Sequence, residues 1–169
     1  MFSNLFSRRA FTSRIATLLP ALGVGAALPS STPAKDKNDN TIKKLNWEGK
    51  PSDPKSFITP LIIHNGLIYV AGQGAHSHDT GEQFPMDIDN HTKRVMENVK
   101  HYVELGGGTM DGILQLNVFL AKIEDYDGMN QVFKTYFPNG GPARTTVAVA
   151  NLPGNSLVEI NCIAAVTRK

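Results

Sequence analysis

Two charged residues, Arg144 and Glu159, stand inside apolar, β-branched segments near the end of the chain. Residues 142–149 read PARTTVAV and residues 157–165 read LVEINCIAA, and both compositions are typical of strands. A charge in such a segment is costly unless it is paired or used. An arginine offers two parallel donors to a carboxylate, and a charged hydrogen bond of this kind contributes about 1.5–3 kcal/mol. Two interpretations stay open: a salt bridge, made between the two residues or with a neighbour, and a site that binds a small acid.

The alternation of residues along these strands predicts where the two charges point. In 158–164 every second residue shares a face, and the apolar set that begins with Val158 suits a core covered by helices. Glu159 therefore points the opposite way, into solvent or into another subunit. On the preceding strand Arg144 shares a face with Thr146, at the start of the strand, where side chains commonly line a cleft.

Histidines and the cysteine offer two other kinds of chemistry. His76 and His78 lie on one side if their segment is extended, but no third ligand has a recognisable spacing, and His91 and His101 fall on different helix faces. Cys162 sits in an apolar strand outside any Cys-His-Asp pattern, which indicates a structural thiol and not a nucleophile. The sequence predicts no metal site.

The pattern of apolar residues and turns predicts one α+β domain. Asn65-Gly66 between two β-branched segments is a strong hairpin signal, because both turn residues need positive φ. A helix should begin at Asp87 and end at the glycines 106–108. The predicted elements, in order, are strands at 41–45, 59–64 and 67–73, a helix at 87–105, a strand at 112–121, a helix at 126–137 and two final strands. Two helices can then cover a single face of a mixed sheet.

The first 34 residues are predicted to be a separate export signal. They contain SRRAF at 7–11 followed by a weakly apolar stretch, which resembles a twin-arginine signal cleaved between about 27 and 34. A membrane anchor is the alternative, but 15–28 is short for a bilayer span. Residues 35–56 are then a linker with the first short strand, and 57–169 form the domain. The protein without its signal has 14 basic and 15 acidic residues, so it has no excess of positive charge that would favour binding to nucleic acid.

Four segments together resemble the reactive-intermediate deaminase family, also called RidA or YjgF. They read GLIYVAGQ, ENVKHYVELGGG, LNVFLAKIEDYDGMNQVFKTYF and PARTTVAVANLPGNSLVEINCIAAV, and the resemblance runs from about 57 to 166. It implies a chorismate-mutase-like fold and a homotrimer with clefts between subunits. It also implies that Arg144 binds the carboxylate of a 2-imino acid, that Glu159 positions or activates the attacking water, and that no metal or organic cofactor is needed.

The resemblance further implies a set of substrate-binding residues: Thr146, Asn130, Phe57, Ala71 and Gly72. Four places depart from the family pattern. Ser56-Phe57-Ile58 stands in place of the usual Gly-Pro-Tyr-Ser-Gln start of the second strand, and Phe57 supplies an aromatic wall only if the hairpin differs in length by one residue. Thr146 stands where cysteine is frequent, Ala71 where serine is usual, and Asn161 where a second glutamate is frequent. The arginine and the first glutamate persist, so the departures bear on substrate range and rate.

These observations predict an exported deaminase that acts in the periplasm. It would convert 2-imino acids such as 2-iminopropanoate or 2-iminobutanoate to 2-keto acids and ammonia, with no stable membrane association after removal of the signal. The alternative is a non-catalytic module that binds a small carboxylate with Arg144 but does not use Glu159. Ribonuclease activity is least favoured, because the charge of −1 and the lack of a basic stripe offer little to a phosphate backbone.

Overall fold

A six-stranded mixed sheet with two helices makes up the fold. The computed structural model describes residues 40–77, 85 and 87–167, so the expected signal at 1–34 lies outside the described residues. The sheet runs in the order β1-β2-β3-β6-β4-β5, and only β4 and β5 are parallel. The bounds are β1 Lys43–Leu45, β2 Leu61–His64, β3 Leu67–Gln73, α1 Ile88–Leu105, β4 Ile113–Leu120, α2 Tyr126–Phe133, β5 Ala143–Ala148 and β6 Val158–Ala165.

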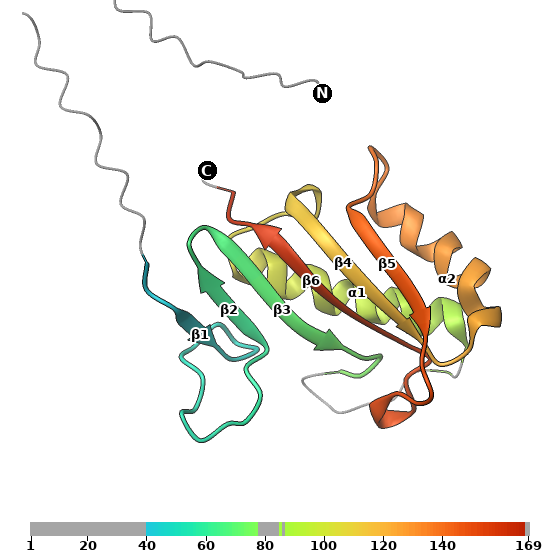
Figure 1. The fold of residues 1–169 in the computed structure, drawn as a ribbon, viewed down its shortest axis with the longest axis horizontal. Helices are drawn as coiled ribbons and strands as arrows, with labels where there is room; N and C mark the ends of the chain where they lie inside the picture. Colours follow the sequence, from blue (N-terminus) through green and yellow to red (C-terminus); the bar gives the residue numbers. More distant parts are fainter. Residues whose placement is uncertain (1–39, 78–84, 86, 168–169) are drawn as a thin grey trace, which may run out of the picture. The chain divides into compact units, whose positions relative to one another are not determined.

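The core lies between one face of the sheet and the helices. Figure 1 shows the strands in front of α1, with α2 beside β5. Leu116 and Val118 of β4 point into this layer and are fully buried, as are Val95 and Val99 of α1. The apolar half of β6, which begins with Val158, also faces the helices, as the alternation predicted. The predicted α+β fold is confirmed.

Local sequence signals account for where the elements begin and end. Asn65 and Gly66 both have positive φ, 50° and 75°, and connect β2 to β3 in the predicted hairpin. Asp87 caps α1 by accepting a hydrogen bond from the Asn90 backbone N–H, and Gly107 takes φ +83° after the last turn. The second helix is shorter than predicted, because 134–136 tighten into a 3-10 turn, as the last turn of a helix often does.

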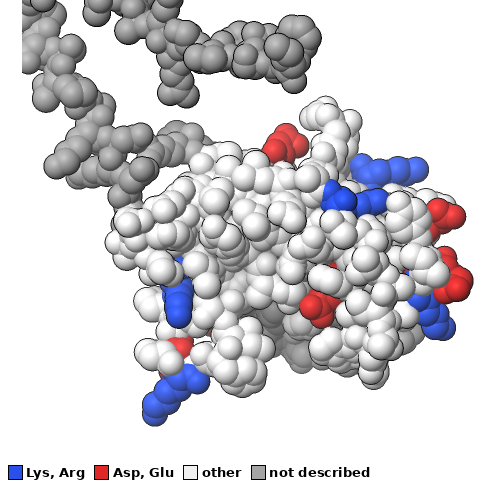
Figure 2. All heavy atoms as spheres, in the orientation of Figure 1, with Lys and Arg blue, Asp and Glu red and all other residues white. Residues whose placement is uncertain are grey.

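The opposite face of the sheet has no helix on it within the described residues. It exposes Tyr69 of β3 and Val147 of β5, which are 37% and 43% accessible, and partly buried Phe119 and Ile163 lie between them. Figure 2 shows the molecule from the side of the strands, with charged side chains mainly toward the margins. We call this surface the open face. A surface that combines apolar side chains with few charged ones can serve as a protein contact.

Among the described residues, no helix is both long enough and apolar enough to cross a membrane.

Candidate functional site

Arg144 lies on β5, at the edge of the sheet, on the side that the helices cover. Its register partner on β4 is the fully buried Leu116, so both side chains share the helix face. Three residues of α2 at positions i, i+4 and i+7 surround the guanidinium, because this spacing places them on one side of a helix. These residues are Tyr126, Asn130 and Phe133.

The contacts of Arg144 hold its guanidinium group without neutralising it. Nη1 donates to Asn130 Oδ1 at 2.7 Å, and Nη2 donates to the Tyr126 hydroxyl oxygen at 3.4 Å. The guanidinium carbon lies 4.7 Å from the centre of the Phe133 ring, within cation–π range. Within the described residues, two of the five N–H donors are used, and both acceptors are neutral. Three donors and the full positive charge therefore remain for a carboxylate.

Thr146 lies beside Arg144 on the same side of β5. Its register partner is Val118, which is fully buried under the helices. The Thr146 hydroxyl oxygen is buried and has no hydrogen-bond partner among the described residues. Buried hydroxyls without a hydrogen-bond partner are rare in folded proteins. Here such a hydroxyl lies beside an arginine that also has unused donors, so both side chains have hydrogen-bonding groups left for a ligand. The structure thus brings together Arg144, Asn130 and Thr146, three of the residues predicted from the sequence. We call them, with Tyr126 and Phe133, the Arg144 cluster.

Glu159 lies on β6 and points into the open face. Its register partner on β4 is Phe119, and its carboxylate lies directly over Gly72 of β3. A Cβ atom built on Gly72 would overlap Glu159 Oε1, so a glycine is needed for this placement. Ala71 is next to Gly72, at an irregularity in the pairing of β3 with β6. Glu159, Gly72 and Ala71 therefore form a second cluster.

The amide of Asn161 is held beside this cluster. Asn161 comes two residues after Glu159 on β6, so the two side chains share the open face. Asn117 Nδ2 of β4 donates to Asn161 Oδ1 at 2.8 Å. At the position where a second glutamate is frequent, this chain therefore places a neutral amide that is bonded across the sheet.

Phe57 belongs to neither cluster. It lies in the segment between β1 and β2, at the edge of the sheet opposite to β5, and it is 97% exposed. Neighbouring strands are about 4.8 Å apart, so the four spacings from β2 to β5 separate this edge from Arg144 by about 20 Å. A Phe57 that lined the Arg144 site would have to come from another chain.

Arg144 and Glu159 do not meet within one chain. Their strands are separated by β4, and the register places Arg144 on the helix face and Glu159 on the open face. This arrangement excludes a salt bridge between the two side chains of one chain. A site that uses both residues needs Arg144 from one copy of the chain and Glu159 from another.

Tyr126 is a residue of the Arg144 cluster that the sequence analysis did not name. Its hydroxyl lies 3.4 Å from Arg144 Nη2 and its ring centre lies 5.8 Å from the guanidinium carbon. The signal was present in the sequence, because Tyr126 precedes Asn130 by four residues and so shares its side of the helix.

The contacts of His91, His101 and Cys162 indicate structural roles for these residues. His91 Nδ1 accepts a hydrogen bond from the Leu157 backbone N–H, and His101 Nε2 lies 2.8 Å from the Trp47 carbonyl oxygen. Burial raises the pKa of the Cys162 thiol to about 12, so it stays protonated and is a poor nucleophile. His78 lies outside the described residues. Among those that are described, no group of three or more His, Cys, Asp or Glu side chains could hold a metal ion.

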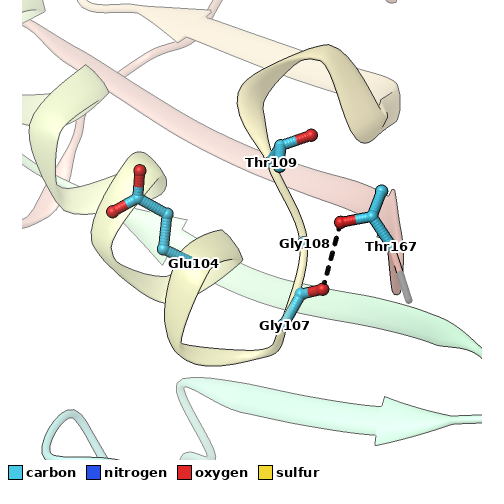
Figure 3. A pocket seen from close by; sticks show the side chains of 5 residues that line it. All are labelled: Glu104, Gly107, Gly108, Thr109 and Thr167. Atoms are coloured by element: carbon cyan, nitrogen blue, oxygen red, sulfur yellow. Dashed lines mark hydrogen bonds between the residues drawn. The ribbon is translucent and has the colours of Figure 1, made fainter. Parts of the chain in front are cut away.

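A cavity of about 530 Å³ lies away from both clusters, at the end of α1. Figure 3 shows Glu104 on one side of it and the hydroxyls of Thr109 and Thr167 on the other. Gly107 lies between them, and its carbonyl oxygen accepts a hydrogen bond from Thr167 Oγ1 at 3.3 Å. Among the described residues the lining contains a carboxylate and no basic side chain, so this part of it does not suit an anionic ligand. The Arg144 cluster fits a carboxylate far better.

Comparison with known proteins identifies the family. The sequence model of the family described as endoribonuclease L-PSP matches residues 51–166, the greater part of the chain. The chain belongs to this family, the RidA or YjgF family. A RutC family protein of Pyrococcus abyssi is 39% identical over 122 residues, which are 72% of this chain and 96% of that protein.

Two further RidA-family relatives carry names or titles that refer to small molecules. A protein of Dermatophagoides farinae named 2-iminobutanoate/2-iminopropanoate deaminase is 33% identical over 99 residues, 59% of this chain and 77% of the relative. The crystal structure of E. coli TdcF with bound serine matches with a TM-score of 0.64 and 25% identity, covering 73% of this chain and 97% of TdcF.

Proposed function

We propose that this RidA-family protein hydrolyses 2-imino acids to 2-keto acids and ammonia, at sites that join two copies of the chain. The observation that carries the proposal is the division of the charges: Arg144 keeps three free donors on one face, and Glu159 rests over Gly72 on the other. The names of the relatives support the same reaction class. A homotrimer, with one such cleft at each contact between copies, is the assembly that we propose.

Each charged residue has a defined part in this reaction. Arg144 binds the carboxylate of the imino acid and so fixes which face of the C=N bond meets the water. Glu159 of the other copy accepts a proton from the water while the water oxygen forms a bond to C2, which gives a tetrahedral aminoalcohol. Glu159 passes that proton to the nitrogen, and the C–N bond breaks to release ammonia. The C2 hydroxyl gives its proton to the ammonia as C2 becomes a carbonyl. In sum, a protonated imino acid and one water give a 2-keto acid and ammonium.

The reaction can be tested directly with a substrate made in place. An amino-acid oxidase acting on alanine supplies 2-iminopropanoate, and keto acid and ammonia are measured above the buffer rate with the full-length chain. We expect wild type to accelerate hydrolysis and Arg144→Ala and Glu159→Gln to abolish the acceleration. Glu104→Gln, a matched change at the distant end of α1, should keep it. Equal rates with and without wild type, for several imines, would refute the proposal.

A carboxylate-binding module without catalysis is the competing proposal, and Glu159 separates the two. A module would bind pyruvate equally well as wild type and as Glu159→Gln, and neither protein would release ammonia from the imine. The deaminase loses turnover in this variant while pyruvate binding persists, because Arg144 is intact. Turnover by wild type therefore decides between them.

We further propose that the protein acts after export, in the periplasm, on the basis of the arginine pair Arg8 and Arg9 and the apolar stretch that follows. Replacing both arginines with lysine keeps the charge but removes the pair. Cell fractionation should then find the variant in the cytoplasm and the wild-type protein in the periplasm. Equal distribution of the two would refute the export proposal and leave the chemistry unaffected.

A further inference from the structure

The hydroxyl of Tyr126 stands at the Arg144 cluster with its proton unused by any described contact. Nη2 of Arg144 donates to the phenolic oxygen at 3.4 Å, so that oxygen is the acceptor and its own O–H remains to donate. Tyr126 is 39% exposed, unlike the buried Thr146 hydroxyl, so a ligand can reach it.

The Tyr126 hydroxyl is close enough to Arg144 to be a second hydrogen-bond donor to a carboxylate bound there. A carboxylate oxygen that accepts from Nη2 at about 2.8 Å can also accept from a hydroxyl 3.4 Å away from that nitrogen, because both donors can reach one oxygen. The guanidinium polarises the hydroxyl that accepts from it, which strengthens the bond that this hydroxyl donates.

We propose that Tyr126 binds substrate, by donating its hydroxyl proton to the carboxylate that Arg144 holds. The inference rests on the proposed function, since it assumes that a carboxylate binds at Arg144. It adds a residue outside the Arg, Asn and Thr set named from the sequence. Because the carboxylate does not change during imine hydrolysis, the bond stabilises bound substrate and transition state alike, so its loss raises KM and leaves kcat close to wild type.

Tyr126→Phe removes only the hydroxyl, because the ring and its contact with the guanidinium remain possible. Tyr136→Phe is the matched control: its hydroxyl donates to Glu97 Oε1 at 2.8 Å, on α1 and away from Arg144. Pyruvate binding to the full-length proteins is measured by calorimetry. We expect Tyr126→Phe to weaken binding about tenfold or more, the usual effect of one hydrogen bond to a charged acceptor, and Tyr136→Phe to change it less than about twofold.

A spectroscopic measurement distinguishes direct contact from a purely structural role. A phenol that donates to a carboxylate changes its ultraviolet absorbance, so pyruvate should produce a tyrosine difference spectrum with wild type. Tyr126→Phe should lose this spectrum and Tyr136→Phe should keep it. A hydroxyl that only supports Arg144 would give no spectrum that depends on Tyr126.

Arg144→Ala separates failure of this inference from failure of the proposed function. If Arg144→Ala loses pyruvate binding while Tyr126→Phe binds like wild type, the role of Tyr126 is refuted and the arginine clamp stands. If Arg144→Ala also binds like wild type, the clamp itself is wrong, and the proposal for Tyr126 is refuted with it. Loss of binding in both, with the spectrum lost in Tyr126→Phe, supports both proposals.

Discussion

Two inactive variants should restore each other when their chains are mixed. Arg144 and Glu159 lie on opposite faces of one sheet. In the proposed assembly a complete cleft therefore takes Arg144 from one chain and Glu159 from its neighbour. Arg144→Ala chains still supply Glu159, and Glu159→Gln chains still supply Arg144. In an equal random mixture half of the chains carry each intact group, so about one quarter of the clefts have both, whatever the number of subunits in a cyclic assembly.

The assay compares two mixtures, each prepared by unfolding and refolding the chains together. Arg144→Ala with Glu159→Gln should give about one quarter of the wild-type imine hydrolysis. Wild type mixed equally with the double variant should also give about one quarter, because each active cleft needs two adjacent wild-type chains. If both groups came from one chain, the same mixtures would give none and about one half. Different affinity tags on the two chains verify by co-purification that mixed assemblies formed. With that verified, no activity in the first mixture and about one half in the second would refute the shared cleft.

Substitutions at Gly72, Asp87 and Leu116 test three local contacts. Gly72→Ala places a methyl group on Glu159 Oε1 and should lower kcat. Circular dichroism checks that the variant still folds. A folded variant with wild-type kcat would contradict the placement of Glu159. Asp87→Ala should lower Tm at neutral pH. Hydrogen bonds from the backbone N–H and then from the side chain of Asn90 hold the pKa of Asp87 below its ordinary value, so the stability that the carboxylate contributes is lost as pH falls through that lowered pKa. The difference in Tm should therefore shrink in acid, and a constant difference would exclude the cap. Leu116→Ala empties a fully buried site and should lower the free energy of unfolding by about 2–5 kcal/mol in urea titration; a loss below about 1 kcal/mol would contradict its packing.

Much of the fold could be predicted because it depends on local rules. The hairpin at Asn65-Gly66 follows from two residues that tolerate positive φ, and the end of α1 follows from the glycines after it. The burial of alternate residues of β6 against the helices, with Glu159 on the other face, follows from a period of two. The 3-10 turn at 134–136 was missed, because apolar spacing alone does not distinguish a last α-helical turn from a tighter one.

The division of the site could not be predicted, because it depends on strand order. Alternation shows which residues of one strand share a face, but only the insertion of β4 between β5 and β6, with its register, shows that Arg144 and Glu159 point in opposite directions. The irregular pairing of β3, which sets Gly72 beneath Glu159, likewise appears only once β3 and β6 are aligned. The contact between Tyr126 and Arg144 follows from the sequence only in part. The spacing of four places Tyr126 and Asn130 on one side of α2, but the packing of that side against β5 is visible only in the structure.

The placement of the two charges on opposite faces has a consequence for how activity depends on the amount of protein. A chain alone can be fully folded and still contain no complete cleft, so on the proposed mechanism turnover appears only with assembly. Assembly follows mass action, so dilution below the dissociation constant should reduce the rate per chain while the circular dichroism of each chain stays the same. In a cell, a small increase in synthesis near that threshold would raise imine hydrolysis more than in proportion.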